Sequence, residues 1–564
     1  MEVTKDKKFK DETPEKTEVQ DVTDLFGKYG AWQIRFLVWM ILGGLPSCWN
    51  NLVIPFLAPE VDYWCQKPSV SLFDNMTTEE WKLLAIPKVG SEYSKCSMYD
   101  IKFNGTEKKD IFINVNKTIP CANFEFDHSL YTSTIQEEWS LTCNNNWLIS
   151  LSQSIYMAGF LIAVLVTGQA SDRVGRRPVM LLCLFIMCVA GFVAAFAPSF
   201  TVFVIARFFI ALGKSGLYTT SFIHLMESCG PEHRTWLGVG SGIGWSIGYV
   251  TLPGIAWLTR DWFMTQLVIT VPGLALVSLW WLIPESPRWL LSQEKMEKAE
   301  EVVKKLMKIN KKECADLPAA LQQIVNKSKK KVENDEKKRH ANMLDLLRTP
   351  GLRKNSLVLF FIWFVTAFIF YGLSLNTNDL YGNPFLNFFI AGAVEFPAQF
   401  LAFVSLKYFG RKMPLLASLF IGGIACSLTI PVPADLQWLR TTFAMLGKLC
   451  ITGTFVFIYI YSAETFPTVV RNVGVGCCST VARIGSIIAP FVKELGRATN
   501  PNVPLGIFGA ISVFGSFLVP LLPETNMHTM MDTLEQGEEF HTKNPKKTKP
   551  EKLELATVSR PVEV

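Results

Sequence analysis

Five ionisable side chains interrupt long apolar segments of this 564-residue sequence: Arg207, Lys214, Glu395, Lys448 and Arg483. A charge at the centre of a bilayer is costly unless it faces a cavity or a partner, so such residues predict a site for an ionic ligand. Arg207 and Lys214 are seven residues apart, which is close to two helical turns, and are expected on one helix face. Lys448 is the weakest candidate of the five.

Arg483 is the strongest single candidate for ligand contact. Its neighbours Ala482, Gly485 and Ser486 are small and leave room beside the guanidinium. A guanidinium can bind a carboxylate through two parallel hydrogen bonds and repels a bare cation. The alternative interpretation is a structural ion pair between Arg483 and Glu395, and both contacts could occur in different states of one cycle.

Aromatic side chains in neighbouring apolar segments could complete the site. Aromatic faces attract ammonium groups through the ring quadrupole, although membrane helices also use aromatic residues for packing alone. The candidates are Trp49, Trp363, Phe370, Tyr371 and Tyr459. An aromatic cage beside an arginine suits a molecule that carries both an amine and an acid.

Twelve apolar segments must position these residues, and each is long enough to cross a hydrocarbon core of ~30 Å as a helix. The composition agrees, because 18% charged residues is well below the roughly 25% of soluble domains. A water-soluble enzyme is thereby disfavoured. The expected spans are 33–58, 147–170, 179–199, 201–223, 236–257, 262–283, 356–376, 385–406, 413–431, 438–461, 472–492 and 503–522.

The distribution of charge orients these spans. Segment 285–355 holds 18 lysines and arginines, whereas 59–146 holds 8 basic residues against 13 acidic ones. The positive-inside rule therefore predicts a cytoplasmic loop at 284–355 and an extracellular loop at 59–146, with cytoplasmic tails at 1–32 and 523–564. Within the cytoplasmic loop, residues 294–312 are expected to form a solvated amphipathic helix.

Cysteines and glycosylation sequons support an extracellular position for 59–146. Cys65, Cys96, Cys121 and Cys143 suggest two disulfides, and the three possible pairings stay open. The sequons begin at Asn75, Asn104 and Asn116. The expected location is the plasma membrane, although internal membranes of the secretory route share this chemistry.

The sequence contains no complete motif for catalysis or for binding a cofactor. Gly213-Lys214-Ser215 lacks the earlier glycine of a phosphate-binding loop, and the six histidines are scattered without a Cys-x-x-Cys pair. We therefore expect no enzyme, no metal and no cofactor. Gly240, Gly244 and Gly248 recur every four residues and predict the close approach of a second helix.

The sequence contains an internal duplication. Gly175-Arg176-Arg177 is echoed by Gly410-Arg411-Lys412, and Pro284-Glu285-Ser286 by Pro523-Glu524-Thr525, at offsets of 235 and 239. Two halves of six helices are therefore expected, at 33–283 and 356–522. Charged residues at corresponding cytoplasmic helix ends could bridge the halves as a conformational latch, or could only determine orientation. The latch candidates are Asp172, Arg173, Arg176, Arg177, Glu227, Arg234, Glu285, Arg288, Arg411, Glu464, Arg471 and Glu524.

These motifs resemble those of the major facilitator superfamily. Gly168-Gln-Ala-Ser-Asp172-Arg173-Val-Gly175-Arg176-Arg177 is similar to its motif between helices two and three, and Pro284-Glu-Ser-Pro-Arg288 to its motif after helix six. In the second copy Leu406-Lys407 stands where the Asp-Arg pair is expected, so a weaker latch is predicted there. The resemblance implies an all-α membrane protein with twelve transmembrane helices in two pseudo-symmetric halves.

Within that superfamily, the long cysteine-bearing first loop resembles the organic cation, anion and zwitterion transporters. Sugar porters share Pro-Glu-Ser-Pro-Arg but usually have a short first loop. Ala463-Glu-Thr-Phe-Pro-Thr is a further match to this family, and Tyr371-Gly-Leu-Ser-Leu and Arg207-Phe-Phe-Ile are nearest to its organic cation/carnitine branch. In the resembled family an arginine at the Arg483 position goes with anions and zwitterions, and an acid with cations.

The sequence therefore predicts a secondary transporter of small organic ions that works by alternating access. The preferred substrates are amine-bearing or zwitterionic metabolites resembling carnitine or amino-acid derivatives, with a coupling ion or counter-substrate left open. If Lys214 takes the place of a transported cation, sodium dependence should be weak. The alternatives are an organic anion exchanger, favoured by Arg207, Lys214 and Arg483, and a transporter-like receptor that moves nothing. No nucleic-acid partner is expected.

Overall fold

A computed structural model describes residues 21–68, 76–89, 92–103, 111–314, 316–335, 343–377, 382–500 and 502–526, together with Met531, Gln536 and Glu538. The chain divides into two compact units. Unit 1 comprises Met1–Arg339, Gly372–Phe396 and Ile487–Ala498, and unit 2 comprises His340–Tyr371, Pro397–Ser486 and Thr499–Val564.

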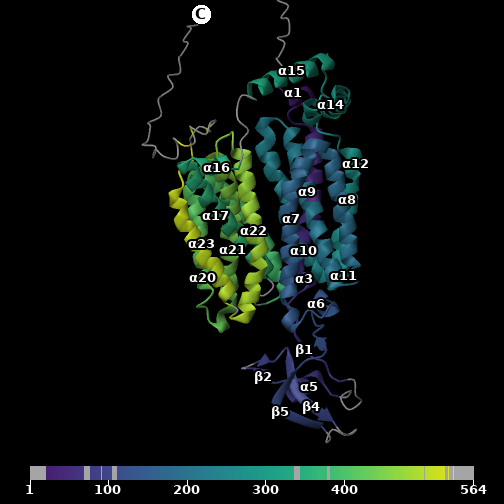
Figure 1. Cartoon of the computed structure of the whole chain (residues 1–564), viewed down its shortest axis with the longest axis vertical. Coiled ribbons are helices and arrows are strands. Elements are labelled where there is room, and N and C mark those ends of the chain that lie inside the picture. Colours follow the sequence, from purple (N-terminus) through teal and green to yellow (C-terminus); the bar gives the residue numbers. More distant parts are fainter. Residues whose placement is uncertain are drawn as a thin grey trace, which may run out of the picture. The chain divides into compact units, whose positions relative to one another are not determined.

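Unit 1 is built on a bundle of long helices that lie side by side (Figure 1). Its helices are α2 (Ala31–Leu52), α3 (Ile54–Leu57), α7 (Trp147–Val174), α8 (Arg176–Ala195), α9 (Phe200–Glu227), α10 (Arg234–Thr259), α11 (Trp262–Ala275) and α12 (Leu279–Leu282). Ser199 and Asp261 cap α9 and α11 by accepting backbone N–H groups. The glycine repeat packs as expected, because a Cβ on Gly244 would lie 2.3 Å from the carbonyl oxygen of Ile41 in α2.

A cluster of short helices covers one end of this bundle. It contains α1 (Val22–Phe26), α13 (Pro287–Ser292), α14 (Met296–Asn310) and α15 (Leu317–Asp335), and Figure 1 shows α1, α14 and α15 close together. Asn310 at the end of α14 donates to the carbonyl of Phe26 and accepts from the backbone of Trp32. These bonds attach the chain before the first span to the loop after the sixth. The amphipathic helix expected at 294–312 is α14.

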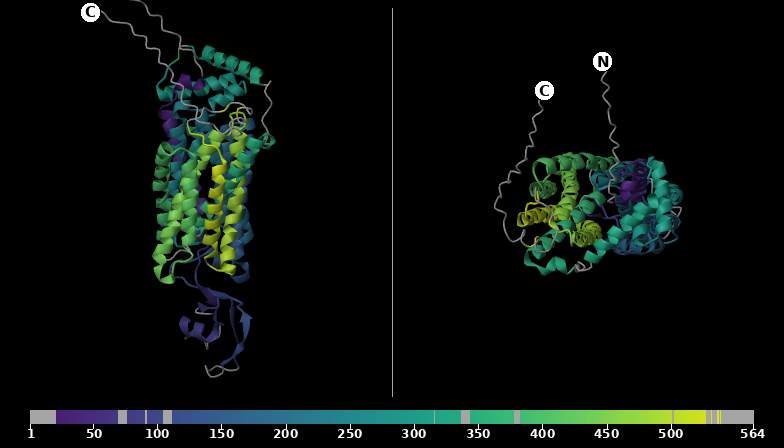
Figure 2. Two further views of the ribbon diagram at one scale, coloured as in Figure 1. Left: turned by 90° about the vertical axis from the view of Figure 1, so that its left-hand side faces the viewer. Right: turned by 90° about the horizontal axis from the view of Figure 1, so that it is seen from above.

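The disulfide-bearing segment lies at the opposite end of the same bundle (Figures 1 and 2). Its described residues form three two-stranded antiparallel sheets, in which β1 (Tyr63–Cys65) pairs with β6 (Phe124–Phe126), β2 (Lys88–Val89) with β3 (Glu92–Tyr93), and β4 (Ser97–Phe103) with β5 (Ile111–Pro120). Helix α5 (Thr78–Ala85) contributes the buried Trp81, whose Nε1 donates to the carbonyl of Cys65. The short α6 (Ile135–Glu138) leads back to the bundle.

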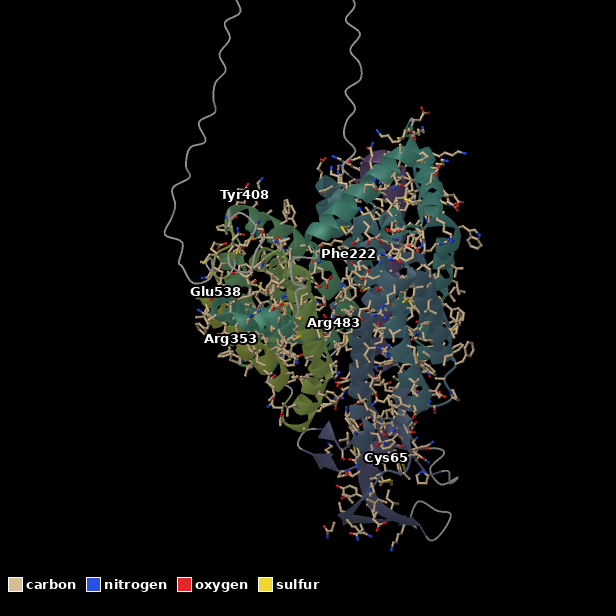
Figure 3. The ribbon with its side chains drawn as sticks, turned by 45° about the horizontal axis from the view of Figure 1, so that its top comes forward. Cys65, Phe222, Arg353, Tyr408, Arg483 and Glu538 are labelled. Carbon is tan, nitrogen blue, oxygen red and sulfur yellow. A yellow bond between two sulfur atoms is a disulfide. The ribbon has the colours of Figure 1, made fainter. Side chains whose placement is uncertain are left out.

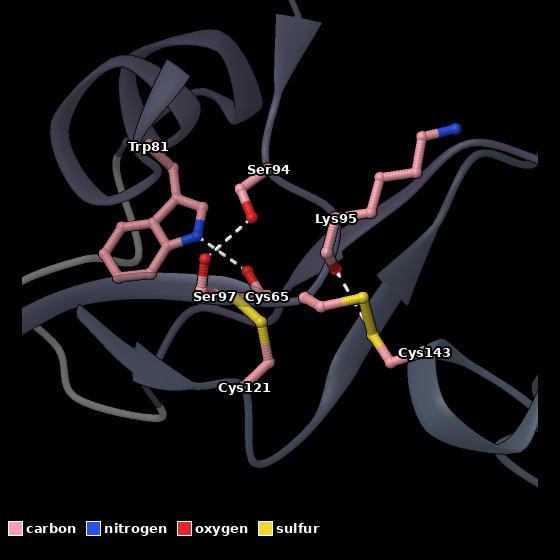
Figure 4. Close-up of a disulfide and its surroundings, with 8 residues drawn as sticks. Cys65, Trp81, Ser94, Lys95, Ser97, Cys121 and Cys143 are labelled. Carbon is pink, nitrogen blue, oxygen red and sulfur yellow. Dashed lines mark hydrogen bonds between the residues drawn. A yellow bond between two sulfur atoms is a disulfide. The ribbon is translucent and has the colours of Figure 1, made fainter. Parts of the chain in front are cut away.

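The disulfides are Cys65–Cys121 and Cys96–Cys143 (Figure 4). This pairing selects one of the three that the sequence left open. The first bond ties β1 to the end of β5, and the second ties the β3–β4 turn to the chain just before α7. Of the three sequon asparagines, Asn116 is exposed on β5, and Asn75 and Asn104 lie outside the described residues.

Unit 2 contains most of the second set of predicted spans. Its elements are α16 (Asp345–Arg348), α17 (Pro350–Leu375), α19 (Glu395–Tyr408), α20 (Lys412–Leu428), α21 (Gln437–Thr465), α22 (Arg471–Ala498) and α23 (Val503–Leu518). Three of them cross between units, because the last residues of α17, the first of α19 and the last turns of α22 belong to unit 1. Helix α18 (Pro384–Ala393) belongs wholly to unit 1 and packs on α10.

All twelve predicted spans coincide with helices. Eight described helices are long and apolar enough to cross a membrane, and Trp262–Ser278 and Lys412–Leu428 are shorter apolar helices. The span expected at 385–406 is interrupted at Val394, between α18 and α19. Pro397 explains the break, because it has no N–H to donate to the carbonyl of Ala393. The sequence predicts that Gly372–Phe396 and Ile487–Ala498 belong to the second half, whereas both segments belong to unit 1. The division into two halves of six helices stays a prediction.

Candidate functional site

Arg483 lies midway along α22 in unit 2 (Figure 3). Its Nη1 donates to the hydroxyl of Tyr371 at 3.5 Å, so α17 and α22 bring together two residues that are 112 positions apart. The helices can approach here because Gly485 has no side chain, and a Cβ at that position would lie 2.6 Å from the carbonyl oxygen of Phe364. Gly485 therefore serves helix packing, and Ala482 and Ser486 are buried.

The predicted aromatic residues of unit 2 form one continuous cluster with Arg483. Trp363 donates from Nε1 to the hydroxyl of Ser462, and its ring meets Tyr459 edge-on at 4.4 Å between centroids. Phe370 lies 5.4 Å from Tyr371. The buried ammonium of Lys448 lies 3.5 Å from the centroid of the Phe370 ring. Trp363, Phe370 and Tyr371 are buried, whereas Tyr459 is 45% exposed and could contact a ligand.

In unit 1, Arg207 and Lys214 both lie against the ring of Tyr156 on α7, at 4.6 and 5.9 Å. Arg207 is fully buried, and its Nη2 donates to Oε1 of Gln153 at 2.7 Å. Its Nε and Nη1 have no hydrogen-bond partner among the described residues. Lys214 also faces the rings of Phe160 and Trp245. This cationic cluster is surrounded by aromatic faces, which is a favourable environment for positive charge.

Trp49 and Glu395 also belong to unit 1. Trp49 is buried and donates from Nε1 to the hydroxyl of Thr251 on α10. Glu395 is 1% exposed at the start of α19. The predicted binding residues are thus divided between the two units, with Arg483, Lys448 and the aromatic cluster in unit 2 and Arg207, Lys214, Trp49 and Glu395 in unit 1.

The latch candidates form two matching clusters, each inside one unit. In unit 1, Arg176 binds both carboxylate oxygens of Glu227, the carbonyl of Ser171 and the carboxylate of Asp172. Glu285 accepts the backbone N–H groups of Arg176 and Arg177 at the start of α8. A carboxylate at a helix N-terminus is favoured by the unpaired N–H groups and the helix dipole. Ser286 completes the cluster by donating to Glu227.

Unit 2 repeats this geometry almost residue for residue. Arg411 binds both oxygens of Glu464 and the carbonyl of Leu406, Glu524 accepts the backbone N–H groups of Arg411 and Lys412, and Thr525 donates to Glu464. Leu406 therefore corresponds to Ser171, and Lys407 corresponds to Asp172. The predicted alignment of Leu406-Lys407 with the Asp-Arg pair is wrong by one residue. Lys407 supplies no carboxylate, so the second cluster has one acidic ligand fewer.

The remaining latch candidates make other contacts. Arg288 is paired with Asp21, which caps α1 and so attaches the N-terminal segment to α13. Arg471 donates to the carbonyl of Phe466 and the hydroxyl of Thr468. Arg234 is half-buried, and Arg173 is exposed. The carboxylates Glu227 and Glu464 bind Arg176 and Arg411 rather than the arginines that follow them by seven residues.

A further charged cluster, which no sequence motif predicted, lies at the opposite end of unit 1 from Arg176. Glu60, which follows α3, accepts hydrogen bonds from Nε and Nη2 of Arg497 at 3.0 and 2.6 Å, and its carboxylate lies 3.2 Å from Lys493. Burial alone would raise the pKa of Glu60, but attraction by Lys493 and Arg497 outweighs it and lowers the pKa to about 2. Arg497 also binds Glu494, which accepts from the hydroxyl of Ser150 on α7.

Aromatic rings lie beside this ionic cluster and join the same parts of the chain. Phe56 on α3 stacks with Phe385 and meets Phe388 edge-on, both of them on α18. Tyr131 contacts Phe385, and Tyr249 on α10 contacts Phe388. The charged members of the cluster, Glu60, Lys493, Glu494 and Arg497, lie just beyond the ends of the predicted spans 33–58 and 472–492, and that position was the available signal.

The Sugar (and other) transporter family matches residues 110–536 of the chain. The chain belongs to this family. It is a membrane transporter and not an enzyme, which agrees with the sequence prediction. The "Organic cation transporter protein" of Drosophila melanogaster is 37% identical to this transporter over 93% of the chain and 95% of the relative. "Solute carrier family 22 member 3" of Mus musculus is 33% identical, covering 91% and 94%.

A third relative of the transporter is the "Organic cation/carnitine transporter 2" of Homo sapiens, 32% identical over 92% of the chain and 93% of the relative. The resemblance inferred from the motifs is thereby confirmed. The xylose transporter XylE of E. coli in its inward open conformation matches 90% of the chain and 100% of its own length, with a TM-score of 0.58 and 16% identity. The transporter therefore has the major facilitator fold.

Proposed function

We propose that this protein is a secondary transporter of small organic ions, and that its substrates carry a carboxylate together with an amine. The observation that carries the proposal is the placement of Arg483 beside Tyr371, next to the aromatic cluster of Trp363, Phe370 and Tyr459. The names of the relatives, which include organic cation and carnitine transporters, support the transport of small organic ions.

Each half of such a substrate matches a different part of the cluster. A guanidinium offers two parallel N–H donors to a carboxylate, and the Tyr371 hydroxyl next to it supplies a further polar contact. Tyr459 exposes part of its ring, and an aromatic face attracts an alkylated ammonium group. A simple cation would gain from the aromatic faces but would be repelled by Arg483 and Lys448. We therefore rank zwitterions above cations.

An organic anion is the second candidate substrate class, and one observation favours it. Arg207, Lys214 and Lys448 are all buried in described parts of the spans, and Arg483 is partly buried. Glu395 is the one acidic residue among the five candidates, and it is buried as well. A ligand with net negative charge would offset this surplus, and stimulation of uptake by a dicarboxylate loaded inside the cell would support exchange.

The mechanism that we propose is alternating access, with the plasma membrane as the location and both termini in the cytoplasm. The charge asymmetry of the loops, the disulfides and the exposed Asn116 support this orientation. The Arg176 and Arg411 clusters are proposed to hold cytoplasmic helix ends in register within each unit while the transport cycle proceeds.

The proposal is tested by uptake into cells that express the protein, with three labelled analogues of one scaffold that differ only in charge. We expect the zwitterion to enter fastest and Arg483→Ala to abolish that uptake. Arg440→Ala is the matched control. Arg440 lies in the first turn of α21, away from the middle of the span, and contacts Asn502. Entry of the cation alone would refute the role of Arg483, and absence of saturable uptake for all three would favour a receptor.

A further inference from the structure

A cavity of about 390 Å³ lies inside unit 2, between α19, α20 and α21. Its walls are almost entirely apolar, and the polar side chains among the described residues that line it are Ser405, Ser418 and Cys450. The volume falls within the range of about 300–1,000 Å³ that is typical of small-molecule sites in proteins. Arg483 and its aromatic cluster do not line this cavity, so it is separate from the proposed substrate site.

The internal duplication shows where unit 2 differs from unit 1. Gly453 corresponds to Gly216 at an offset of 237 residues, which also relates the glutamates of the two arginine clusters. A Cβ on Gly216 would lie 2.6 Å from Sγ of Cys183 and 2.7 Å from Cγ2 of Thr167, so unit 1 is closely packed at this position. Among the described residues, a Cβ on Gly453 would meet no other helix within 4 Å, and its nearest contact is Phe457 of its own helix at 3.6 Å.

Two substitutions between the repeats account for this difference. At the offset of 235 residues, Thr167 corresponds to Ala402, which lacks the methyl group that fills this place in unit 1. Cys183 corresponds to Ser418, whose hydroxyl lies 2.8 Å from that of Thr454. Ala402 and Ser418 both line the cavity, so the sequence of the second repeat creates it.

The hydroxyl groups in the cavity wall can accept a hydrogen bond from a ligand. The Thr454 hydroxyl donates to the carbonyl of Cys450. The single proton of the Ser418 hydroxyl goes to Thr454 or to the carbonyl of Leu415, so the lone pairs of Ser418 keep the capacity to accept. A hydrocarbon tail has no donor for this acceptor, whereas a sterol carries one hydroxyl on a rigid apolar frame. The wall therefore favours a sterol over an acyl chain.

The mouth of the cavity lies on an exposed apolar surface of unit 2. Leu401, Phe409 and Met413 line the cavity and are exposed, and in a membrane transporter such a surface faces hydrocarbon. Tyr408 lies beside them at the end of α19 (Figure 3), with the ammonium of Lys407 5.6 Å from its ring. Tyrosine and lysine at the end of a span are typical of the head-group level. The cavity thus opens to the bilayer near the depth at which the hydroxyl of a sterol lies.

We propose that this cavity binds a membrane sterol, with the sterol hydroxyl donating to Ser418 and the ring system lying against Gly453 and Ala402. Residues 406–411 also carry the Leu-x-Tyr-x-x-Arg pattern that is associated with sterol contact, and Phe409 within this pattern lines the cavity. The inference requires only that the chain is a membrane transporter and is independent of the substrate and of the transport cycle proposed above.

The test uses the full-length protein in the membranes of cells that express it. A photoreactive cholesterol analogue with an alkyne tag is cross-linked by light, and labelling is measured relative to the total amount of purified protein. The labelled peptides should come from α19, α20 or α21, and unlabelled cholesterol should compete. Its 3α-hydroxyl epimer should compete about fivefold less well, because it loses one hydrogen bond, to Ser418.

Three variants connect labelling to the cavity. Gly453→Leu places a side chain in the cavity and should lower labelling about tenfold. Gly476→Leu is the matched control, because a Cβ on this glycine of unit 2 also meets no described atom within 4 Å. Ser418→Ala should lower labelling about fivefold and abolish the preference for cholesterol over its epimer.

Equal labelling of Gly453→Leu and Gly476→Leu would overturn the proposal, as would equal competition by the two epimers in the unmodified protein. Stronger labelling of the same peptides by a photoreactive fatty acid would assign the cavity to acyl chains and would also overturn it. Ala402→Thr restores the residue found in unit 1 and should lower labelling by a smaller factor than Gly453→Leu. This variant keeps the test decisive if Gly453→Leu does not fold.

Discussion

The two matching arginine clusters provide an internal comparison of burial and charge. Arg176→Gln removes the bonds to both oxygens of Glu227, to the Ser171 carbonyl and to Asp172, and leaves Glu227 with the Ser286 hydroxyl. Arg411→Gln removes the corresponding bonds to Glu464 and to the Leu406 carbonyl. The two substitutions are chemically identical and act at equivalent positions.

The expected costs differ because the first cluster is better shielded. The Arg176 side chain is 8% exposed and Glu227 19%, whereas Arg411 and Glu464 are 24% and 23% exposed. Breaking a buried ion pair by removing one partner costs about 3–5 kcal/mol, and solvent reduces this for exposed pairs. We expect a loss of about 3 kcal/mol for Arg176→Gln and about 1.5 kcal/mol for Arg411→Gln. Asp172 is 69% exposed and contributes about 0.5 kcal/mol of the difference.

The assay is the apparent thermal midpoint of the purified protein in detergent. At about 2–4 °C per kcal/mol for units of this size, Arg176→Gln should lower the midpoint by about 6–12 °C and Arg411→Gln by about half as much. Arg176→Lys keeps the charge but loses the two-pronged geometry, so an intermediate loss is expected. Arg173→Gln, at an exposed residue of the same turn, is the control. A loss for Arg411→Gln that equals or exceeds that for Arg176→Gln would refute the argument from burial.

Further predictions concern pH, recognition, the extracellular segment and helix packing. The lowered pKa of Glu60 means that its ion pairs with Lys493 and Arg497 stabilise this end of unit 1 fully above the ordinary pKa of 4.5 and are lost only as the pH falls towards 2. The drop in thermal midpoint caused by Glu60→Gln should therefore be the same at pH 5.5 and pH 8, and a smaller drop at pH 5.5 would contradict this assignment. Arg483→Lys should retain less than a tenth of zwitterion uptake while surface biotinylation stays normal, because one ammonium cannot replace the paired donors; full activity would show that charge alone suffices. Cys65→Ser opens a loop closed over 56 residues, which in the chain-entropy view is worth about 4 kcal/mol, so protease resistance of the extracellular segment should fall sharply, and unchanged resistance would show that the Trp81 core suffices. Gly244→Leu should abolish surface expression whereas Gly242→Leu should not, since a side chain at 244 would meet the backbone of α2 and one at 242 would meet no atom within 4 Å.

Local sequence determined the elements of this transporter. Apolar segments of sufficient length specify helices in a bilayer, where every backbone polar group must be bonded within its own segment. For that reason all twelve spans were predictable, and the glycine repeat even indicated the face on which α10 meets α2. The duplicated motifs predicted equivalent charged clusters at equivalent helix ends, because the same short motif caps the same kind of helix twice.

Tertiary structure alone decided the partners. Glu227 follows Arg176 by 51 residues and pairs with it instead of with Arg234, and the pairing of four cysteines was undetermined until the strands were in register. Glu60 and Arg497 are separated by 437 residues and lie outside any apolar run, so nothing in their surroundings along the chain connects them. Their contact arises where α3 and α22 end beside each other. Hydrophobic periodicity is a local property that one segment encodes by itself, whereas an ion pair depends on two segments whose mutual position is set by the packing of all the others.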